Sequence, residues 1–195
     1  ALVLRVSFSG ELGYEVYVPA PAAQQLVDII YEKGEAFGVA PYGLDAMEIL
    51  RVEKGHITGT ELDGNATLAD VGLDKMARPD GGYIGAVMEK RPGLVAADRK
   101  VLIGLKTQRA SDQMVNGAHV VENETLQEPA NSLGHVSASC PSPTLNSNIA
   151  LAMVRGGRER MGSTLYVSDP LSGTHFPVEV VSPHFFDPKG ERQRA

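Results

Sequence analysis

The stretch that decides the fold is Leu4-Arg5-Val6-Ser7-Phe8-Ser9-Gly10-Glu11-Leu12-Gly13-Tyr14-Glu15-Val16-Tyr17-Val18. Apolar and polar side chains alternate over residues 4–8 and again over residues 14–18, which is the two-residue period of a β-strand. The glycine-rich residues between them are typical of a turn, so the stretch predicts a β-hairpin. A turn centred near Glu11 would place Glu15 opposite Ser7, with Arg5 diagonal to Glu15 on the same face.

The segment that follows the hairpin has the pattern of helices. Pro21 stands where a first helical residue is expected. Apolar residues then recur at helical spacing, so residues 21–37 predict an amphipathic helix. Residues 44–50 predict a second, shorter helix by the same spacing. Residues 67–76 predict a third short helix, with Thr67 as its N-terminal cap.

The character of the sequence changes near residue 95. Downstream of it, almost every segment reads as a short strand between turns, which is typical of a small barrel or sandwich. The predicted strands are residues 101–106, 119–122, 135–139, 149–154, 164–167 and 176–181. We therefore predict an α+β protein, in which residues 1–94 form an α/β domain and residues 95–195 form an all-β domain.

Composition limits the class of protein. The chain has 195 residues, of which 43% are apolar and 22% charged, as in ordinary globular proteins. Its net charge of −6 argues against nucleic acid as a partner, because such a partner requires a basic face. No apolar run is long enough to predict contact with a membrane. The single Cys140 excludes an intrachain disulfide and a cysteine-rich metal site, and a cytoplasmic location is expected.

Four segments resemble a known family. The stretch from Arg5 to Glu15 has an arginine, an aromatic residue, two glycines and two glutamates in that family's order. Residues 43–55, 67–73 and 134–152 match further segments of it in the same order. Over residues 5–186 the chain resembles the aminomethyltransferase (glycine-cleavage T-protein) family. This resemblance implies a folate-binding domain with a ferredoxin-like α/β segment, followed by a C-terminal β-barrel.

Three shorter segments resemble one subgroup of this family, the sarcosine oxidase alpha subunits. They are Glu53-Lys54-Gly55-His56, Gly72-Leu73-Asp74-Lys75-Met76 and Phe185-Phe186-Asp187-Pro188-Lys189-Gly190-Glu191-Arg192. The resemblance implies the C-terminal, tetrahydrofolate-binding portion of such a subunit. That portion passes the one-carbon unit from oxidised sarcosine to tetrahydrofolate, which gives 5,10-methylenetetrahydrofolate.

The chain opens directly in a strand pattern, without an initiator methionine, so we expect it to be part of a longer chain. The expected partners are tetrahydrofolate, an N-terminal half and other subunits, and flavin and NAD would bind only in those other regions. Two alternatives stay open. One is a glycine-cleavage aminomethyltransferase or the tail of a dimethylglycine dehydrogenase, and the other is a folate-binding module without catalytic activity.

The resemblance implies four folate-binding residues, which are Glu15, Phe8, Tyr17 and Phe185. The carboxylate of Glu15 would accept two parallel N–H groups of the pterin, and the aromatic rings would contact its flat face. Each has a structural alternative: an ion pair with Arg5 for Glu15, core packing for Phe8 and Phe185, and ordinary surface for Tyr17. The family's catalytic aspartate lies upstream of the hairpin, so this chain is expected to hold no catalytic residue and no metal site.

Four further positions refine the hypothesis. Met47 replaces an arginine that helps to hold folate in the transferases, and methionine cannot pair with an anion. Arg51 on the same helix is either a substitute for that arginine or part of a structural ion pair. His56 stands where a sister group, which supports iron–sulfur enzymes, has a cysteine, and this argues against that group. Cys140 is expected to be a small buried side chain rather than a nucleophile.

Overall fold

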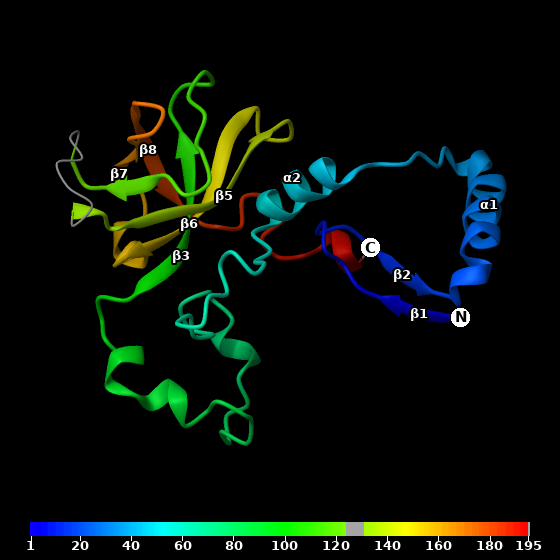
Figure 1. The fold of residues 1–195 in the computed structure, drawn as a ribbon, viewed down its shortest axis with the longest axis horizontal. Helices are drawn as coiled ribbons and strands as arrows, with labels where there is room; N and C mark the ends of the chain where they lie inside the picture. The colour runs from blue at the N-terminus through cyan, green and yellow to red at the C-terminus, as the bar shows by residue number, and fades with distance from the viewer. Residues whose placement is uncertain (124–130, 195) are drawn as a thin grey trace.

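The second half of the protein is a closed, six-stranded antiparallel β-barrel. The computed structural model describes residues 1–123 and 131–194. The strands are β3 (Lys100–Thr107), β4 (His119–Val121), β5 (Gly134–Ser142), β6 (Ser147–Arg155), β7 (Thr164–Asp169) and β8 (Thr174–Val181). They pair in the order β3-β6-β5-β4-β7-β8, and β8 closes the barrel on β3 (Figure 1). The six predicted strands are confirmed, and the barrel replaces the sandwich alternative.

The barrel strands bury apolar side chains on two sides. Ile103 and Leu105 of β3 belong to the cluster that fills the barrel, together with Val154 of β6. The intervening Leu102 belongs instead to a second cluster, which also contains Val52 of the preceding helix. Because β3 and β6 are covered on both faces, β6 reads as a nearly continuous apolar run rather than an alternating one.

The hairpin forms, but in a different register from the predicted one. Strand β1 (Leu2–Arg5) pairs with β2 (Tyr14–Tyr17) so that Leu4 lies opposite Glu15. The turn is therefore not centred on Glu11. Residues 6–13 leave the ladder because Gly10, with a φ of +86°, packs directly against the side chain of Lys54. This contact with a distant helix lengthens the loop, and a pattern within the hairpin cannot reveal it.

Two of the three predicted helices are present. Helix α1 (Ala23–Gly34) lies between 3₁₀ turns at Ala20–Ala22 and Glu35–Phe37, and α2 spans Leu44–Lys54. The prediction for residues 67–76 was wrong, because only Asp74–Met76 form a 3₁₀ turn there. The backbone of this segment bonds outward, since the carbonyl of Asp70 accepts from the amide of Leu102 on β3. Further 3₁₀ turns lie at Met88–Lys90, Pro92–Leu94, Gly157–Arg160 and Arg192–Arg194.

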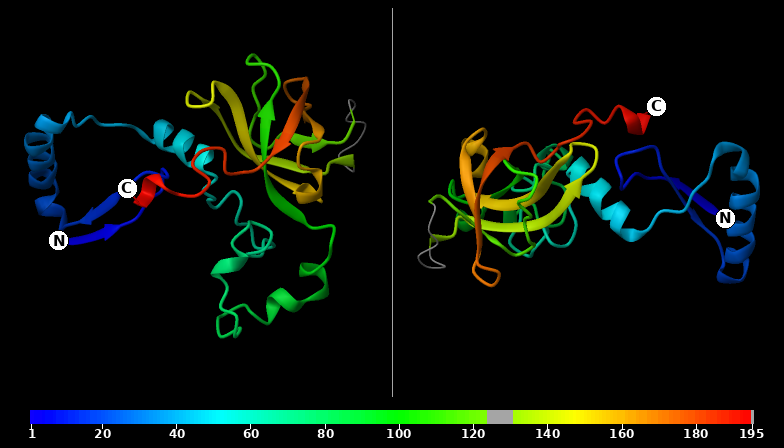
Figure 2. Two further views of the ribbon diagram at one scale, coloured as in Figure 1. Left: turned by 180° about the vertical axis from the view of Figure 1, so that it is seen from behind. Right: turned by 90° about the horizontal axis from the view of Figure 1, so that it is seen from above.

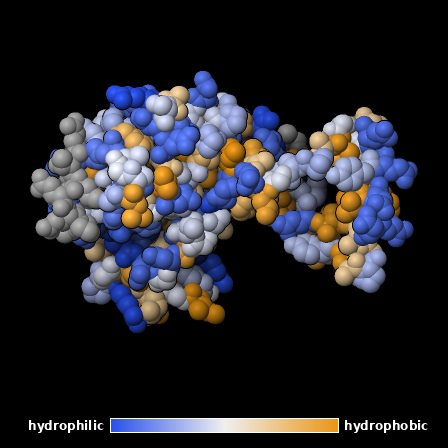
Figure 3. All heavy atoms as spheres, turned by 45° about the horizontal axis from the view of Figure 1, so that its top comes forward, coloured by the Kyte–Doolittle hydropathy of each residue, from blue (hydrophilic) through white to orange (hydrophobic). Residues whose placement is uncertain are grey.

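The hairpin and α1 lie at one end of the molecule and the barrel at the other (Figures 1 and 2). Helix α2 and the C-terminal segment bridge the two ends, and the space-filling view shows the smaller lobe set apart from the larger one (Figure 3). The α+β class is confirmed. Of the predicted ferredoxin-like segment, the described residues form a two-stranded sheet and α1.

The last turn of α2 fastens this bridge to the barrel. The carboxylate of Glu53 is 2% exposed and accepts hydrogen bonds from Ser142 Oγ at 2.5 Å and Thr144 Oγ1 at 3.0 Å. Its backbone carbonyl accepts from the amide of Phe186 at 3.0 Å. Both hydroxyls belong to the turn region between β5 and β6, so one carboxylate holds the helix on the barrel.

The tightest constraint within the barrel is at Gly134. A Cβ atom placed there would lie 1.9 Å from the carbonyl oxygen of Met153 on the paired strand. We expect Gly134→Ala to lower the free energy of unfolding by about 1–3 kcal/mol, because the strands must separate locally. Gly59→Ala is the matched control, since a Cβ at Gly59 meets nothing within 4 Å. Urea denaturation measures both, and equal stabilities would contradict the packing described.

Candidate functional site

The C-terminal segment crosses the end of α2 and forms a junction there. Lys54 Nζ donates to the carbonyl of Asp187 at 2.5 Å and to its carboxylate at 3.0 Å. Burial would raise the pKa of Asp187, but amide N–H groups and Lys54 outweigh it and hold that pKa below its usual range. Helix α2 ends at Gly55, where a Cβ would lie 2.3 Å from the carbonyl oxygen of Pro183. Only glycine permits this close crossing.

The same segment holds the hairpin. Arg5 Nη2 donates to the carbonyl of Gln193 at 2.7 Å, and Arg192 Nε donates to the carboxylate of Glu11 at 2.5 Å. The guanidinium of Arg192 also lies over the ring of Phe186, 5.3 Å from its centroid. These contacts are exposed and individually weak. Together they fix the direction in which the hairpin leaves the junction.

A cavity of about 420 Å³ opens at this junction. Its lining includes Lys54, His56, His184 and a short apolar stretch at residues 71–73. The volume falls within the ordinary range for small-molecule sites. Burial, aided by the charge of Lys54, lowers the pKa of His56, so its imidazole is neutral at pH 7 and can accept or donate a hydrogen bond.

The four residues predicted to bind folate are distributed over two places. Glu15 and Tyr17 project from β2 and are exposed, and the hydroxyl of Tyr17 donates to the Glu15 carboxylate. That bond and the adjacent negative charge raise the pKa of Tyr17. Phe8 is 37% exposed and meets the ring of His56 edge-on, with centroids 6.2 Å apart. Phe8 therefore lies beside the junction cavity.

Phe185 lies on the barrel side of the junction. It is half-buried against the second apolar cluster, and a Cβ added at Gly104 of β3 would lie 2.8 Å from its ring. This is the core packing that formed its structural alternative. The neighbouring His184 does line the junction cavity, so the segment around Phe185 reaches the site although its own ring packs on the barrel.

The ion pair between Glu15 and Arg5, which was the structural alternative for Glu15, does not form. Arg5 lies opposite Tyr14 rather than on the Glu15 face, and its guanidinium is used by the carbonyl of Gln193. Within residues 1–123 and 131–194, no cation forms an ion pair with Glu15. Its carboxylate is thus a solvent-facing charge oriented only by Tyr17. None of the described cavities includes it in its lining.

Sequence reasoning missed the burial of Glu53 and Lys54 on α2, although it kept a structural ion pair as one role for Arg51. Arg51 is 2% exposed, donates to Glu48 and to the carbonyl of His56, and lies 3.6 Å from the carboxylate of Glu61. It therefore forms the structural ion pair that was its alternative role. Met47, one turn earlier, is half-buried. Arg51, Glu53 and Lys54 lie within four residues and project to different sides of the helix, so a helix end packed on several sides must bury some of them, which was a usable signal.

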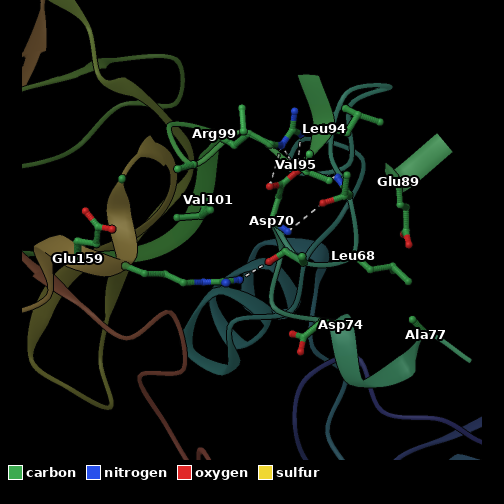
Figure 4. Close-up of a pocket in the computed structure, with 16 residues that line it drawn as sticks. Leu68, Asp70, Asp74, Ala77, Glu89, Leu94, Val95, Arg99, Val101 and Glu159 are labelled. Carbon is green, nitrogen blue, oxygen red and sulfur yellow. Dashed lines mark hydrogen bonds and ion pairs between the residues drawn. The ribbon is translucent and has the colours of Figure 1, made fainter. Parts of the chain in front are cut away.

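A second cavity, of about 450 Å³, lies between the loop after α2 and the start of the barrel (Figure 4). Arg99 is bound to the carboxylate of Asp70 through Nε at 3.1 and 3.0 Å. Burial alone would raise the pKa of Asp70, but the hydrogen bonds from Arg99 and Thr67 lower it below its usual value. Arg158 donates to the carbonyl of Ala69 from the opposite wall. These contacts tie the loop to the barrel.

Two negative findings hold for the part of the chain that the structure describes. No group of three or more His, Cys, Asp or Glu side chains is placed to hold a metal ion. None of the helices in that part has the length and apolar character needed to cross a membrane.

Two family models match the chain. The GCVT N-terminal domain matches residues 1–80, and the glycine cleavage T-protein C-terminal barrel domain matches residues 100–187. The chain belongs to the glycine-cleavage T-protein family. A solved member, the glycine cleavage system aminomethyltransferase T from Bartonella henselae, has the same fold, with a TM-score of 0.77 and 22% identity. That likeness covers 95% of this chain and 50% of the solved one.

The similar curated members of the family are enzymes. The chain is 39% identical to the sarcosine oxidase subunit alpha of Rhizobium meliloti over 193 residues, 97% of this chain and 19% of the relative. Identity to the subunit alpha of Corynebacterium sp. (strain U-96) is 33%, over 99% of this chain and 20% of the relative. Identity to the aminomethyltransferase of Streptomyces avermitilis is 32%, over 95% of this chain and 49% of the relative. The chain thus spans about a fifth of the oxidase subunits and half of the transferase.

We expect the pair of Asp70 and Arg99 to make stability depend on pH. The lowered folded-state pKa of Asp70 means that its contribution is complete above the ordinary carboxyl value of 3.8. That contribution is lost as the pH falls through the lower folded-state pKa. Asp70→Asn should lower the free energy of unfolding at pH 7 by about 1–3 kcal/mol. The difference from the wild type should shrink in acid, and a difference independent of pH would contradict the assignment.

Cys140 should be unreactive in the folded protein. It is 8% exposed on β5, and burial, with the nearby Glu53 and Glu48 carboxylates, raises the pKa of its thiol to about 12. Since the thiolate is the reactive form, alkylation by iodoacetamide at pH 8 should be at least about 100-fold slower in buffer than in concentrated urea. Mass spectrometry measures both rates. Similar rates would show an accessible nucleophile and would contradict the buried placement.

Proposed function

We propose that the chain is the tetrahydrofolate-binding region of an enzyme of the sarcosine oxidase alpha type. Membership of the glycine-cleavage T-protein family supports a folate-linked role. Similarity to oxidase subunits over nearly the whole chain supports the narrower proposal that the enzyme is of the sarcosine oxidase alpha type. The enzyme would oxidise sarcosine in other parts of the assembly. This chain would receive the one-carbon unit at tetrahydrofolate, in the cytoplasm.

The observation that carries the proposal is the Glu15 carboxylate. It is charged, solvent-facing and free of any cation in the described chain, and the hydroxyl of Tyr17 orients it. The pyrimidine edge of a pterin presents two parallel N–H donors. A carboxylate matches such a pair by accepting both, and charge-assisted bonds of this kind are about twice as strong as neutral ones. The acceptor that Glu15 provides therefore fits the donor pair of the ligand.

A flat ligand at Glu15 would be held by the hairpin together with other parts of the protein. The C-terminal segment fixes the hairpin through Arg5 and Glu11. Phe8, on the hairpin's loop, extends an aromatic surface toward His56 and the junction cavity. The wall on the far side of Glu15 would come from outside the described residues, as the open faces of β1 and β2 allow.

The contribution of this chain to the reaction is binding and orientation. Tetrahydrofolate, when bound, supplies a nucleophilic nitrogen that accepts the one-carbon unit. Glu15 would fix the distance of the pterin from the incoming reactant, and Phe8 would fix the plane of its ring. Holding two reactants in place removes an entropic barrier that can reach roughly 7–11 kcal/mol in well-oriented systems. No catalytic acid or base is assigned within the chain.

Met47 favours the oxidase reading over the transferase reading. It is half-buried on α2, at the position where the transferases are expected to place an arginine that helps to hold folate. A thioether cannot replace the charge or the hydrogen bonds of that arginine. Arg51 cannot compensate from the next turn of the helix, because it is buried and bound to Glu48. The ligand should therefore be held differently from that of a transferase.

We expect Glu15→Gln in the full-length protein to weaken tetrahydrofolate binding by about 10- to 100-fold, because the amide loses the charge and one acceptor atom. Isothermal titration under anaerobic conditions measures the dissociation constant. Phe8→Leu should weaken binding by a smaller factor, because it removes an aromatic contact without removing a charge.

Glu179→Gln is the matched control, because Glu179 is an exposed glutamate on β8, far along the barrel from the hairpin. It should bind tetrahydrofolate as the wild type does. If Glu15→Gln and Glu179→Gln bind equally well, Glu15 does not contact the pterin. If neither the variants nor the wild type binds tetrahydrofolate, the proposed function itself is wrong.

A further inference from the structure

A third cavity, separate from the junction, is built differently from the other two. It has a volume of about 260 Å³ and lies where the loop after α2 meets strands β3, β5 and β6. Its lining includes Glu61 and Asp63 from the loop, Lys100 from β3 and His135 from β5. Charges of both signs therefore face one small space. Neither the hairpin nor the C-terminal segment contributes to it.

Glu61 is the unusual member of this lining. Its side chain is fully buried, and Oε2 accepts from the Thr58 amide at 2.7 Å and lies 3.6 Å from Arg51 Nη1. Oε1 has no hydrogen-bond partner. A buried carboxylate oxygen without a donor is destabilising, and native proteins supply such a group with a ligand, a water molecule or another side chain. The structure thus contains an acceptor that lacks its donor.

Of the other charged groups in the lining, one already has hydrogen-bond partners in the protein and one has no ion-pair partner in the described part of the chain. Arg99 is already committed to protein groups, because each of its nitrogens donates to Asp70 or to the carbonyl of Gly93 or Asn65. Lys100 is exposed at the rim and forms no ion pair within the described residues. Lys100 at the surface and the buried Oε1 of Glu61 are therefore left without a partner in the described residues.

His135 of β5 lines the same cavity as these two groups. Burial, and then the charge of Lys100, lowers the pKa of its imidazole, while Asp63 and Glu61 act in the opposite direction. The ring is therefore neutral at pH 7 and adds no positive charge that would repel an ammonium group. It can also serve as a reporter, because a ligand in the cavity changes the electrostatic surroundings of the ring.

We propose that this cavity binds a small zwitterion of the amino-acid type. Its ammonium group would donate to Oε1 of Glu61 and lie close to Asp63, and its carboxylate would face Lys100. A simple cation would leave Lys100 unused, and a simple anion would leave Glu61 without a donor. The site is independent of the proposed folate site, since it shares no residue with the hairpin.

The test uses the full-length protein and three probes: glycine, methylammonium and acetate. Glycine should shift the imidazole signals of His135 in a saturable manner in NMR spectra. It should bind at least about 10-fold more tightly than either probe that carries only one of its charges. The signals of His175, which stacks on Tyr166 at the β7–β8 pair, should not move.

Variants identify the groups responsible. Glu61→Gln should weaken glycine binding by about 10-fold or more, and Lys100→Met should weaken it by less, because Lys100 is exposed. Because Glu61 is buried, the glycine affinity of Glu61→Gln is compared with that of the wild type only when the circular dichroism and melting temperature of the two proteins match. Lys100→Met and Asp63→Asn lie at the surface and keep the test valid if Glu61→Gln does not fold.

Three results would overturn the proposal. The first is the absence of any saturable His135 shift with glycine, which would leave water as the partner of Glu61. The second is equal binding of glycine and methylammonium, which would remove the role of Lys100. The third is unchanged glycine binding in both Lys100→Met and Asp63→Asn. Tetrahydrofolate binding should be unaffected by glycine, so failure here is distinct from failure at the hairpin.

Discussion

The structure depends on the burial of three charges among the last four residues of α2. Arg51, Glu53 and Lys54 are 2%, 2% and 8% exposed, and each finds its partner in a different part of the chain. Arg51 lies between Glu48 and the loop that follows the helix, Glu53 is bound by hydroxyls of the barrel, and Lys54 is bound by the C-terminal segment. A buried charge is tolerated only when it is paired, so each contact is required once the helix is in place.

This constraint explains why the hairpin occupies a defined position although both of its strands are exposed. The side chain of Lys54 packs against Gly10 in the hairpin loop while its ammonium group holds Asp187. The segment fixed by Asp187 then supplies the partners of Arg5 and Glu11. The position of the hairpin is thus set by α2 and the C-terminal segment, while the hydroxyl of Tyr17 orients the Glu15 carboxylate itself.

The sequence was sufficient for whatever depends on local pattern. The barrel strands follow from short apolar or alternating runs between turn residues, and α1 and α2 follow from helical spacing, because the burial of one face of a helix leaves a periodic pattern in the sequence. The hairpin register and residues 67–76 could not be predicted in this way. In both, a distant partner decides the backbone: Lys54 for the hairpin loop, and Leu102 for Asp70. Such long-range contacts produce no periodic pattern in the sequence.

The candidate site was predictable to a similar extent. Glu15 and Tyr17 do lie together, and the family pattern around the hairpin pointed to them. Phe185 turned out to pack on Gly104, because a C-terminal segment that covers a barrel must bury its aromatic rings there. Glu61 was missed, since a single glutamate in a glycine-rich loop resembles an ordinary surface residue. Only coordinates show that it is buried and lacks a donor for Oε1.

The loop after α2 shows how this protein makes cavities without regular secondary structure. Successive parts of it line the junction cavity, the small cavity at Glu61 and the larger one at Asp70. An irregular loop keeps such walls in place only if its backbone is fixed at several points. Here the fixing points are charged: Glu61 faces Arg51 near one end, and Asp70 binds Arg99 near the other. The ion pairs therefore fix the loop that forms the cavity walls, in addition to stabilising the fold.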